Sequence, residues 1–226
     1  MGFTTRRGGV SDPPYDSLNL GRTSGDREDA VAENRRRALA ALGLDGARLA
    51  TAGLVHGSAV AEVRDAGHAP ACDALLTRER GLVLAVTTAD CLPIILTAPG
   101  IVAVAHCGWR GTAAGLPRAA VVACGAAAGM APDQITAHLG PCIRPCCYEV
   151  GPEVARKFPA RVSTWVEGRH RLDLAEAARR QLVDSGVPPE SIHDTAACTC
   201  CAPDWYFSHR RDGARYGRHW ALVALS

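Results

Sequence analysis

Short apolar runs, separated by glycine, proline or aspartate, dominate the middle of the chain. Runs of this length with few polar positions inside them are typical of strands buried on both faces. Six runs fit this description, and they lie at residues 60–63, 82–87, 92–96, 101–105, 135–139 and 220–225. We therefore expect a β-core that is largely shielded from solvent.

Three segments between or beside these runs have the composition or the apolar spacing of helices. The first is expected to begin after a cap at Ser24 or Asp26 and to continue to about residue 42. The second is the alanine-rich segment 112–128, and the third, at 172–183, has apolar residues at helical intervals. Because strands and helices do not alternate regularly, the pattern favours an α+β fold.

Composition agrees with a soluble globular protein. Hydrophobic residues make up 47% and charged residues 21% of the 226 positions. The 25 basic and 23 acidic residues leave a formal charge of +2, which gives no electrostatic reason to expect a nucleic-acid or membrane partner. No linker or internal repeat divides the chain. We expect a single domain that covers residues 1–226.

The ten cysteines are the unusual feature of the composition. A secreted disulfide-rich protein is expected to carry a signal peptide, and the first residues contain no apolar stretch of that kind. The longest charge-free run, at residues 91–109, is interrupted by Pro93, Pro99 and Gly100, and is therefore expected to form two strands and a turn. A cytoplasmic protein with reduced thiols is the expectation.

Three of the apolar runs are flanked by a histidine or a cysteine next to small or turn-forming residues. These residues are His56, Cys91 and His106. Two imidazoles and one thiolate would give zinc three protein ligands and an open fourth position, as in catalytic zinc sites. The same ligands also suit copper. The spacing matches no compact ligand motif, so the residues themselves leave open that each is an ordinary core residue.

Motifs distributed along almost the whole chain resemble a known family. They are RGGVS (7–11), SLNLG (17–21), GD (25–26), ENR (33–35), VHG (55–57), DALLT (73–77), TADCLPI (88–94), AHCGWRGT (105–112), GPCI (140–143), CYEVG (147–151), LDL (172–174), ACT (197–199), FSHRRDG (207–213) and GR (217–218). On these motifs the chain resembles the multicopper polyphenol oxidoreductase, or laccase-domain, family, whose members are described as purine nucleoside phosphorylases.

The resemblance implies a mixed β-core flanked by helices and a metal site at His56, Cys91 and His106. It implies zinc as the metal, with copper as the alternative. The implied reactions are phosphorolysis of adenosine, inosine, guanosine or methylthioadenosine and hydrolytic deamination of adenosine. A purine nucleoside and phosphate are then the expected partners, and we expect a monomer.

Candidate site residues follow from the residue types in the same motifs. We expect Cys91, Asp90 and Arg110 to be catalytic. The expected substrate-binding residues are Arg6, Arg7, Asp73, Trp109, Arg210 and Arg211. Structural alternatives stay open, because the two aspartates could be turn or capping residues, the tryptophan a core residue and any arginine a solvated or ion-paired group.

Three other functions are compatible with parts of the sequence. A cysteine hydrolase could use Cys91 as nucleophile with His56 or His106 as its base. A copper-dependent polyphenol oxidase is disfavoured, because the eight histidines include no His-x-His pair, an arrangement common at multicopper centres. A non-enzymatic metal-binding or redox protein would use the same ligands without turnover.

Six cysteines near glycine and proline form two groups, GPCIRPCC and ACTCC. They are Cys142, Cys146, Cys147, Cys198, Cys200 and Cys201. Read as Cys-x3-Cys-Cys and Cys-x-Cys-Cys, their spacing differs from the paired Cys-x2-Cys of common zinc sites, so buried thiols are expected rather than a second metal or a disulfide. Two departures from the family pattern lie near the first site, where Leu54 replaces a usual glutamine and Cys107 a small residue.

Overall fold

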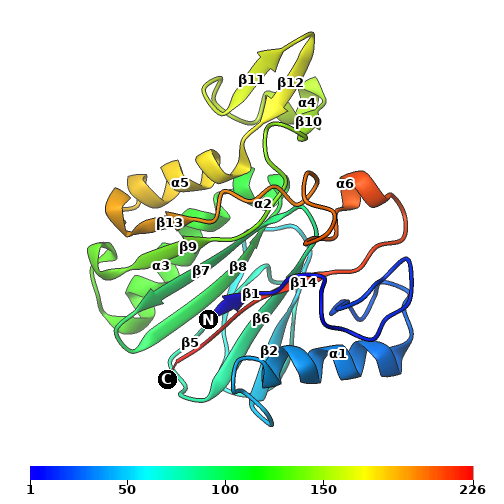
Figure 1. Ribbon diagram of the computed structural model, residues 1–226. Coiled ribbons are helices and arrows are strands. Elements are labelled where there is room, and N and C mark those ends of the chain that lie inside the picture. Colours follow the sequence, from blue (N-terminus) through cyan, green and yellow to red (C-terminus); the bar gives the residue numbers. More distant parts are fainter. Residues whose placement is uncertain (226) are drawn as a thin grey trace.

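The computed structural model describes residues 1–225 and contains two central sheets (Figure 1). The first is five-stranded, with β14 and β6 antiparallel at its centre and β2 parallel to both β6 and β4. Its strands, in spatial order, are β1 (Gly2–Phe3), β14 (His219–Ala224), β6 (Leu82–Thr88), β2 (Arg48–Gly53) and β4 (Gly67–Pro70).

The second sheet is six-stranded, and its centre is the antiparallel pair β7 and β8. In spatial order its strands are β13 (Ile192–Asp194), β9 (Thr136–Leu139), β7 (Leu92–Ala98), β8 (Ile101–Cys107), β5 (Ala74–Thr77) and β3 (Val60–Glu62). The remaining elements outside the two sheets are α1 (Glu28–Ala40), α2 (Trp109–Ala113), α3 (Leu116–Ala128), η1 (Pro132–Gln134), α4 (Pro152–Ala155), α5 (Leu174–Asp184), η2 (Pro189–Ser191) and α6 (His209–Asp212), with a small sheet described below.

The two sheets pack against each other and are covered on their outer faces by helices (Figure 1). Leu84 of β6 and Val104 of β8 belong to the apolar layer between the sheets. The neighbouring residues Val83 and Ala85 point the other way, into the layer beneath α1. On the far side, Ala103 of β8 packs in the layer with α3 and α5. The order across the molecule is therefore helix, sheet, sheet, helix.

This four-layer arrangement explains the uninterrupted apolar runs. Because successive side chains of a strand point to opposite faces, a strand with one face on helices and the other on a second sheet needs apolar residues throughout. All seven residues of β8 are buried, as are the first five of both β6 and β7. The six predicted strands and the α+β class are confirmed.

The predicted helix at 112–128 is wrong in one respect, since the segment contains a break. The chain forms α2, then turns at Gly115 with φ of 87°, and then forms α3 with Pro117 in its first turn. This left-handed conformation is accessible to glycine at little cost and ends a helix. The first helix also begins later than expected, at Glu28 after Arg27, because Asp26 accepts hydrogen bonds from Ser11 and Asn19 instead of capping it.

A small antiparallel sheet projects from the layered body near α4 and α5 (Figure 1). It consists of β10 (Glu149–Val150), β12 (Arg169–Leu172) and β11 (Ser163–Val166), and its Trp165 is exposed. The apolar pattern predicted neither this sheet nor β2, β4, β5 and β13. Within residues 1–225, every helix is too short or too polar to traverse a lipid bilayer.

Candidate metal centre and its cavity

The structure brings His56, Cys91 and His106 together at one end of the two sheets. One donor atom from each residue lies within 4.8 Å of the others. The two imidazole rings meet edge to face, with their centroids 4.9 Å apart and an interplanar angle of 72°. Residues that are separated by 35 and 15 positions in the sequence thus form one compact donor set.

The crossing of the chain between the sheets creates this site. His56 follows β2 of the five-stranded sheet in the connection to β3 of the six-stranded sheet. Cys91 lies in the connection from β6 to β7, which also passes between the sheets. His106 is near the end of β8, opposite Pro93 at the start of β7, so the antiparallel register places it beside Cys91. Strand ends in such a rigid core present side chains in fixed positions.

Asp73 holds two of the three ligands in place. One of its carboxylate oxygens accepts hydrogen bonds from the backbone N–H of His56 at 2.9 Å and from Nδ1 of His106 at 2.9 Å. The other accepts from the backbone N–H of Val55 at 3.1 Å and of Gly57 at 2.8 Å. Burial opposes protonation of His106, but the charges and hydrogen bonds of Cys91 and Asp73 outweigh burial and raise its pKa to about 9. Because Nδ1 donates its hydrogen to Asp73, Nε2 is the nitrogen that would bind a metal after losing its proton, as in carboxylate-bound histidine ligands.

The charges of the site suit a cation. Burial opposes ionisation of Asp73, but its hydrogen bonds from His106 and from backbone amides outweigh burial and lower its pKa. Burial also opposes ionisation of Cys91, yet the charges and hydrogen bonds of His106 and His56 lower its pKa to about 6. A thiolate is the form of cysteine that binds metals. Cys107 differs, since burial raises its pKa and its side chain packs in the apolar core.

Space for an ion depends on Gly108. A Cβ atom at this position would lie 2.9 Å from Nδ1 of His56 and 3.1 Å from Sγ of Cys91. Its φ of −69° is ordinary for any residue, so glycine is needed here for space and not for backbone conformation. His56 and Asp90 are instead non-glycine residues in the left-handed region, with φ of 59° and 81°. The donor set and the cleared space fit a metal with three protein ligands.

The donor set opens into a cavity of about 870 Å³, a size ordinary for small-molecule sites. Five of the predicted site residues line it together with the two histidines: Asp90, Cys91, Trp109, Arg110 and Arg210. The guanidinium of Arg110 lies over the Trp109 ring, 4.4 Å from its centroid. Leu54, where the family pattern has glutamine, also lines the cavity.

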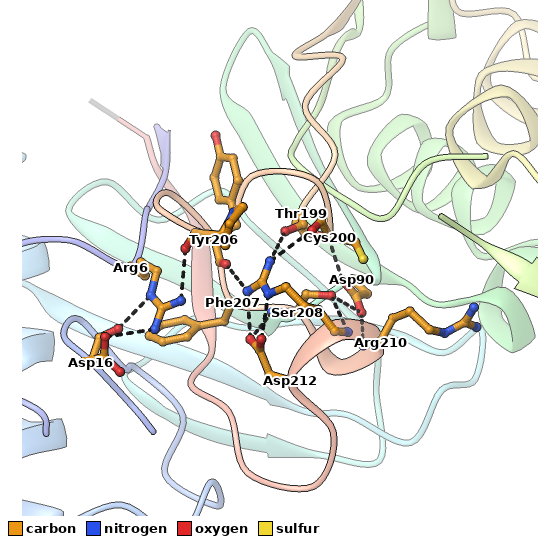
Figure 2. Close-up of polar contacts among 12 residues, drawn as sticks. Arg6, Asp16, Asp90, Thr199, Cys200, Tyr206, Phe207, Ser208, Arg210 and Asp212 are labelled. Atoms are coloured by element: carbon orange, nitrogen blue, oxygen red, sulfur yellow. Dashed lines mark hydrogen bonds and ion pairs between the residues drawn. The ribbon is translucent and has the colours of Figure 1, made fainter. Parts of the chain in front are cut away.

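The Asp90 carboxylate is occupied by neighbouring groups (Figure 2). It accepts hydrogen bonds from the hydroxyl of Thr199 at 2.6 Å, the hydroxyl of Ser208 at 3.0 Å and the backbone N–H of Arg210 at 2.7 Å. The Arg210 side chain extends away from this carboxylate (Figure 2) and donates to the carbonyl of Glu149 at 2.9 Å. Asp90 therefore ties α6 and the segment before it to the connection that carries Cys91.

The other predicted arginines lie outside the residues that line the cavity. Arg6 donates to the carbonyl of Asp16 at 2.7 Å and lies over the Phe207 ring (Figure 2). Arg7 stacks on the Trp205 ring, with its guanidinium carbon 3.9 Å from the centroid. Arg211 donates to three backbone carbonyls, at Thr199, Cys200 and Tyr206. Each of these guanidinium groups braces a loop beside the site.

Several residues that line the cavity were not predicted from the sequence. They are Arg22, Arg35, His68, Tyr148, His209, Tyr216 and Arg218. Of the described residues that line the cavity, Asp90 alone is acidic, so five arginines give the cavity a positive potential. The signal was present in the motifs, because ENR ends at Arg35, GR ends at Arg218, and Arg22 directly follows SLNLG.

The cysteines outside the site are not uniformly buried thiols. Cys142 is buried, as expected. The expectation of buried thiols is wrong for the other five, since Cys146 and Cys201 are exposed and Cys147, Cys198 and Cys200 are only half-buried. The interpretation of the spacing was also wrong, because Cys198 and Cys201 by themselves form a Cys-x2-Cys pair. Cys72 and Cys124 are buried and pack in the core.

Comparison with known proteins gives consistent similarities. A family model described as "Multi-copper polyphenol oxidoreductase laccase" matches residues 1–226. Purine nucleoside phosphorylase YlmD of Geobacillus stearothermophilus is 38% identical over 242 residues, covering 98% of this chain and 88% of the relative. Purine nucleoside phosphorylase ORF3 of Streptomyces griseus is 44% identical over 220 residues, covering 93% and 88%. Purine nucleoside phosphorylase YfiH of Escherichia coli is 40% identical over 218 residues, covering 92% and 87%.

Solved structures agree with the fold. The crystal structure of YlmD from Geobacillus stearothermophilus matches with a TM-score of 0.93 at 38% identity, covering 99% of this chain and 90% of that one. The crystal structure of Bacillus licheniformis hypothetical protein YfiH matches with a TM-score of 0.93 at 34% identity, covering 100% and 92%.

Proposed function

Because the chain belongs to the multi-copper polyphenol oxidoreductase laccase family, with relatives named purine nucleoside phosphorylases, we propose that it is a metal-dependent enzyme of purine nucleosides. Its reactions are phosphorolysis of adenosine, inosine, guanosine or methylthioadenosine and hydrolytic deamination of adenosine. The observation that carries the proposal is a three-ligand donor set at the base of an arginine-lined cavity. We place the enzyme in the cytoplasm, where thiolate ligands stay reduced.

His56, Cys91 and His106 would hold zinc, with copper as the alternative metal. A bound zinc ion supplies Lewis-acid chemistry at the open coordination position. The chain itself fixes the ligand geometry, since the Asp73 carboxylate accepts hydrogen bonds from both histidine-bearing segments. It also holds Cys91 ready as a thiolate.

The arginines suit the second substrate, phosphate. Phosphorolysis breaks the bond between the purine nitrogen and C1′ of the ribose and forms a bond from C1′ to a phosphate oxygen. The phosphate dianion must therefore be held on one side of the ribose, and guanidinium groups bind such oxygens in pairs of hydrogen bonds. Arg110 lies nearest in sequence to a metal ligand and lines the cavity, and we assign it the leading role. Arg210 and Arg218 line the same space.

The purine needs a flat apolar surface, which Trp109 offers at the cavity wall. Arg110 lies over this ring and would restrict its orientation. Asp90 lines the cavity and would serve as an acid or base for the purine, while its hydrogen bonds anchor α6. Arg6, Arg7 and Arg211 would support binding through the loops that they brace.

Product analysis tests this function. Purified chain with quantified metal is incubated with adenosine, inosine and methylthioadenosine, with and without phosphate, and the products are separated by chromatography. With phosphate we expect free base together with ribose 1-phosphate from adenosine and inosine, and 5-methylthioribose 1-phosphate from methylthioadenosine. Without phosphate we expect only inosine, from adenosine. The Cys91→Ala variant should lose metal and both activities together. Wild-type chain with full metal that yields neither free base nor inosine would overturn the proposal.

One observation favours a second candidate, a cysteine hydrolase. Asp73, His106 and Cys91 form a hydrogen-bonded series of carboxylate, imidazole and thiol, as in enzymes with a cysteine nucleophile. Chelation distinguishes the two functions. Activity that survives complete removal of metal and is lost on alkylation of Cys91 would support the nucleophile, whereas activity lost on chelation and restored by zinc supports the metal enzyme.

A further inference from the structure

A second group of sulfur atoms gathers away from the cavity. The group, called here the four-cysteine cluster, consists of Cys146, Cys147, Cys198 and Cys201. Its four Sγ atoms all lie within 4.8 Å of one another. Sγ of Cys201 is 3.2 Å from that of Cys147 and 3.5 Å from that of Cys146. None of the four lines the cavity described above.

We propose that the four-cysteine cluster binds a second zinc ion, in a closed structural site. Structural zinc is typically held by four ligands at the corners of a tetrahedron, with Zn–S distances of about 2.3 Å. Such a tetrahedron places its sulfur atoms about 3.8 Å apart. The separations of 3.2 and 3.5 Å, with an upper limit of 4.8 Å, bracket this value.

The backbone around the cluster is organised independently of any ion. The segment that follows β9 and the segment that follows β13 pair through a parallel bridge between Cys142 and Cys198. The N–H of Thr199 donates to the carbonyl of Cys142 at 3.0 Å. The Arg144 guanidinium forms a partly buried ion pair with Asp194 beside this bridge. Two segments more than 50 positions apart are thereby preset to present their sulfurs to one point.

Arginine side chains lie against the backbone of the two segments, where a tetrathiolate site would carry negative charge. One Zn²⁺ with four thiolates has a net charge of about −2 (2 − 4). Arginine side chains donate hydrogen bonds to backbone carbonyls of the two segments, from Arg144 to Ala197, from Arg171 to Cys146, from Arg210 to Cys147, and from Arg211 to Thr199 and Cys200. Positive charge close to a thiolate site stabilises its ionised form.

The proposed site has a structural consequence for the cavity. The segment after β9 carries Ile143 and Tyr148, which line the cavity, and Arg210 donates to the carbonyl of Cys147. An ion that joins this segment to the one after β13 would fix one wall of the substrate site. Four protein ligands leave no open position for chemistry, so the second ion is expected to act on KM and on stability.

Metal content per chain tests the proposal, and Cys200 offers a matched control. Full-length chains of wild type, the double variant Cys147→Ser/Cys201→Ser and Cys200→Ser are purified under argon in zinc-containing medium, and zinc is measured by mass spectrometry. Cys200 lies in the same segment but outside the four-cysteine cluster. We expect the double variant to hold one zinc ion per chain fewer than Cys200→Ser, and Cys200→Ser to match wild type. Equal zinc content in the two variants would overturn the proposal.

Cobalt binding to wild-type chain needs no variant and covers the case in which the double variant fails to fold. Metal-depleted chain is titrated with Co²⁺ under argon, and the thiolate-to-cobalt charge-transfer absorption is recorded. The first site supplies one sulfur, and the four-cysteine cluster would add four. An intensity that corresponds to five thiolates supports the proposal. An intensity that corresponds to one thiolate would show that the cluster cysteines are free thiols, and would refute the proposal. A mass of the unreduced chain that is lighter by two hydrogens, mapped to Cys147 and Cys201, would show a disulfide and would refute it as well.

Discussion

At the scale of single residues, the candidate metal centre depends on the absence of a side chain at Gly108 as much as on its three donor residues. Gly108 leaves the space beside Nδ1 of His56 and Sγ of Cys91, where a Cβ atom would lie 2.9 and 3.1 Å away. Its backbone conformation is open to alanine. The position is therefore one where a single methyl group should act on ligand geometry alone.

We expect Gly108→Ala to weaken metal binding at least tenfold while the chain stays folded, because the ligands must shift to accommodate the methyl group. Competition with a chelator measures the affinity, and thermal unfolding of the metal-depleted chain measures the fold. Gly57→Ala is the control, since its Cβ would meet Val55 at 3.5 Å and Asp73 at 3.7 Å, both ordinary contacts. Equal affinities of the two variants would show that space at Gly108 is not limiting.

Asp73→Asn tests the carboxylate that joins the ligands. Each oxygen of Asp73 accepts hydrogen bonds from two N–H groups, so either orientation of an amide would place its NH2 against two donors. Loss of such an acceptor behind a ligand histidine typically reduces metal affinity about 10–100-fold. Unfolding of the apo chain should also require less denaturant. Asp65→Asn, at an exposed aspartate, should change neither quantity.

Much of the site was predictable at this scale, and the part that was not has a physical reason. That His56, Cys91 and His106 lie together was predictable, because cysteine and histidine beside strand ends carry a chemical signal and these three match family motifs. Arg22, Arg35 and Arg218 were not, since arginine is common on surfaces and only the fold places these three around one cavity. The Cys-x2-Cys spacing of Cys198 and Cys201 was overlooked, because Cys200 lies between them and the segment was interpreted as Cys-x-Cys-Cys.

At the scale of elements, buried strands were the most predictable part of the chain. β6, β7 and β8 have both faces covered, so burial alone dictates their composition. β4 is largely exposed and contains glycine, histidine and proline, which carry no strand signal. The small sheet β10–β12–β11 likewise contains mostly polar residues. Pairing with neighbours, and not local preference, makes these segments strands.

The alanine-rich composition of residues 112–128 predicted one continuous helix and gave no sign of the break between α2 and α3. Gly115 adopts φ of 87°, and a Cβ atom added to it would meet nothing within 4 Å, so strain and not crowding opposes a side chain there. We expect Gly115→Ala to lower the free energy of unfolding by about 1 kcal/mol, as measured by urea denaturation. Gly115→Asn should cost less, because asparagine tolerates this conformation. A stability gain for the alanine variant would indicate that the two helices merge.

At the scale of the whole molecule, the net charge is close to zero, but the charged residues that line the cavity are mostly arginines. The formal charge of +2 gave no indication of an anionic substrate, yet five arginines and one aspartate line the same cavity. Net charge describes solubility and long-range association, whereas substrate binding depends on where the charges lie. Net charge therefore could not predict the group of arginines that lines the cavity.

Global stability should depend on pH through His219. Burial lowers the pKa of this histidine to about 3, and its Nε2 accepts a hydrogen bond from the N–H of Phe207 at 2.9 Å. As pH falls below about 6.5, the unfolded chain takes up a proton that the native chain does not, so stability is lost by up to about 1.4 kcal/mol per pH unit. Above that pH the effect is absent.

His219→Gln isolates this contribution, because glutamine does not titrate and its Oε1 can accept from Phe207. We expect its urea midpoint to fall less steeply than that of wild type between about pH 6.5 and 4. The difference between the two urea midpoints at each pH removes the contribution of carboxylates that titrate in both chains. Parallel pH profiles would show that His219 is not the source of the acid sensitivity.

The passage of the chain between the sheets links metal binding to the alignment of the molecule's two halves. His56 is carried by the end of β2 in one sheet, and His106 by β8 in the other. An ion held by both contributes free energy only when the sheets are in register, and by thermodynamic reciprocity it stabilises that register. Metal retention should then depend on packing in the layer around Leu84 and Val104, which lies between the two sheets. Substitutions there should be detectable first as lost metal.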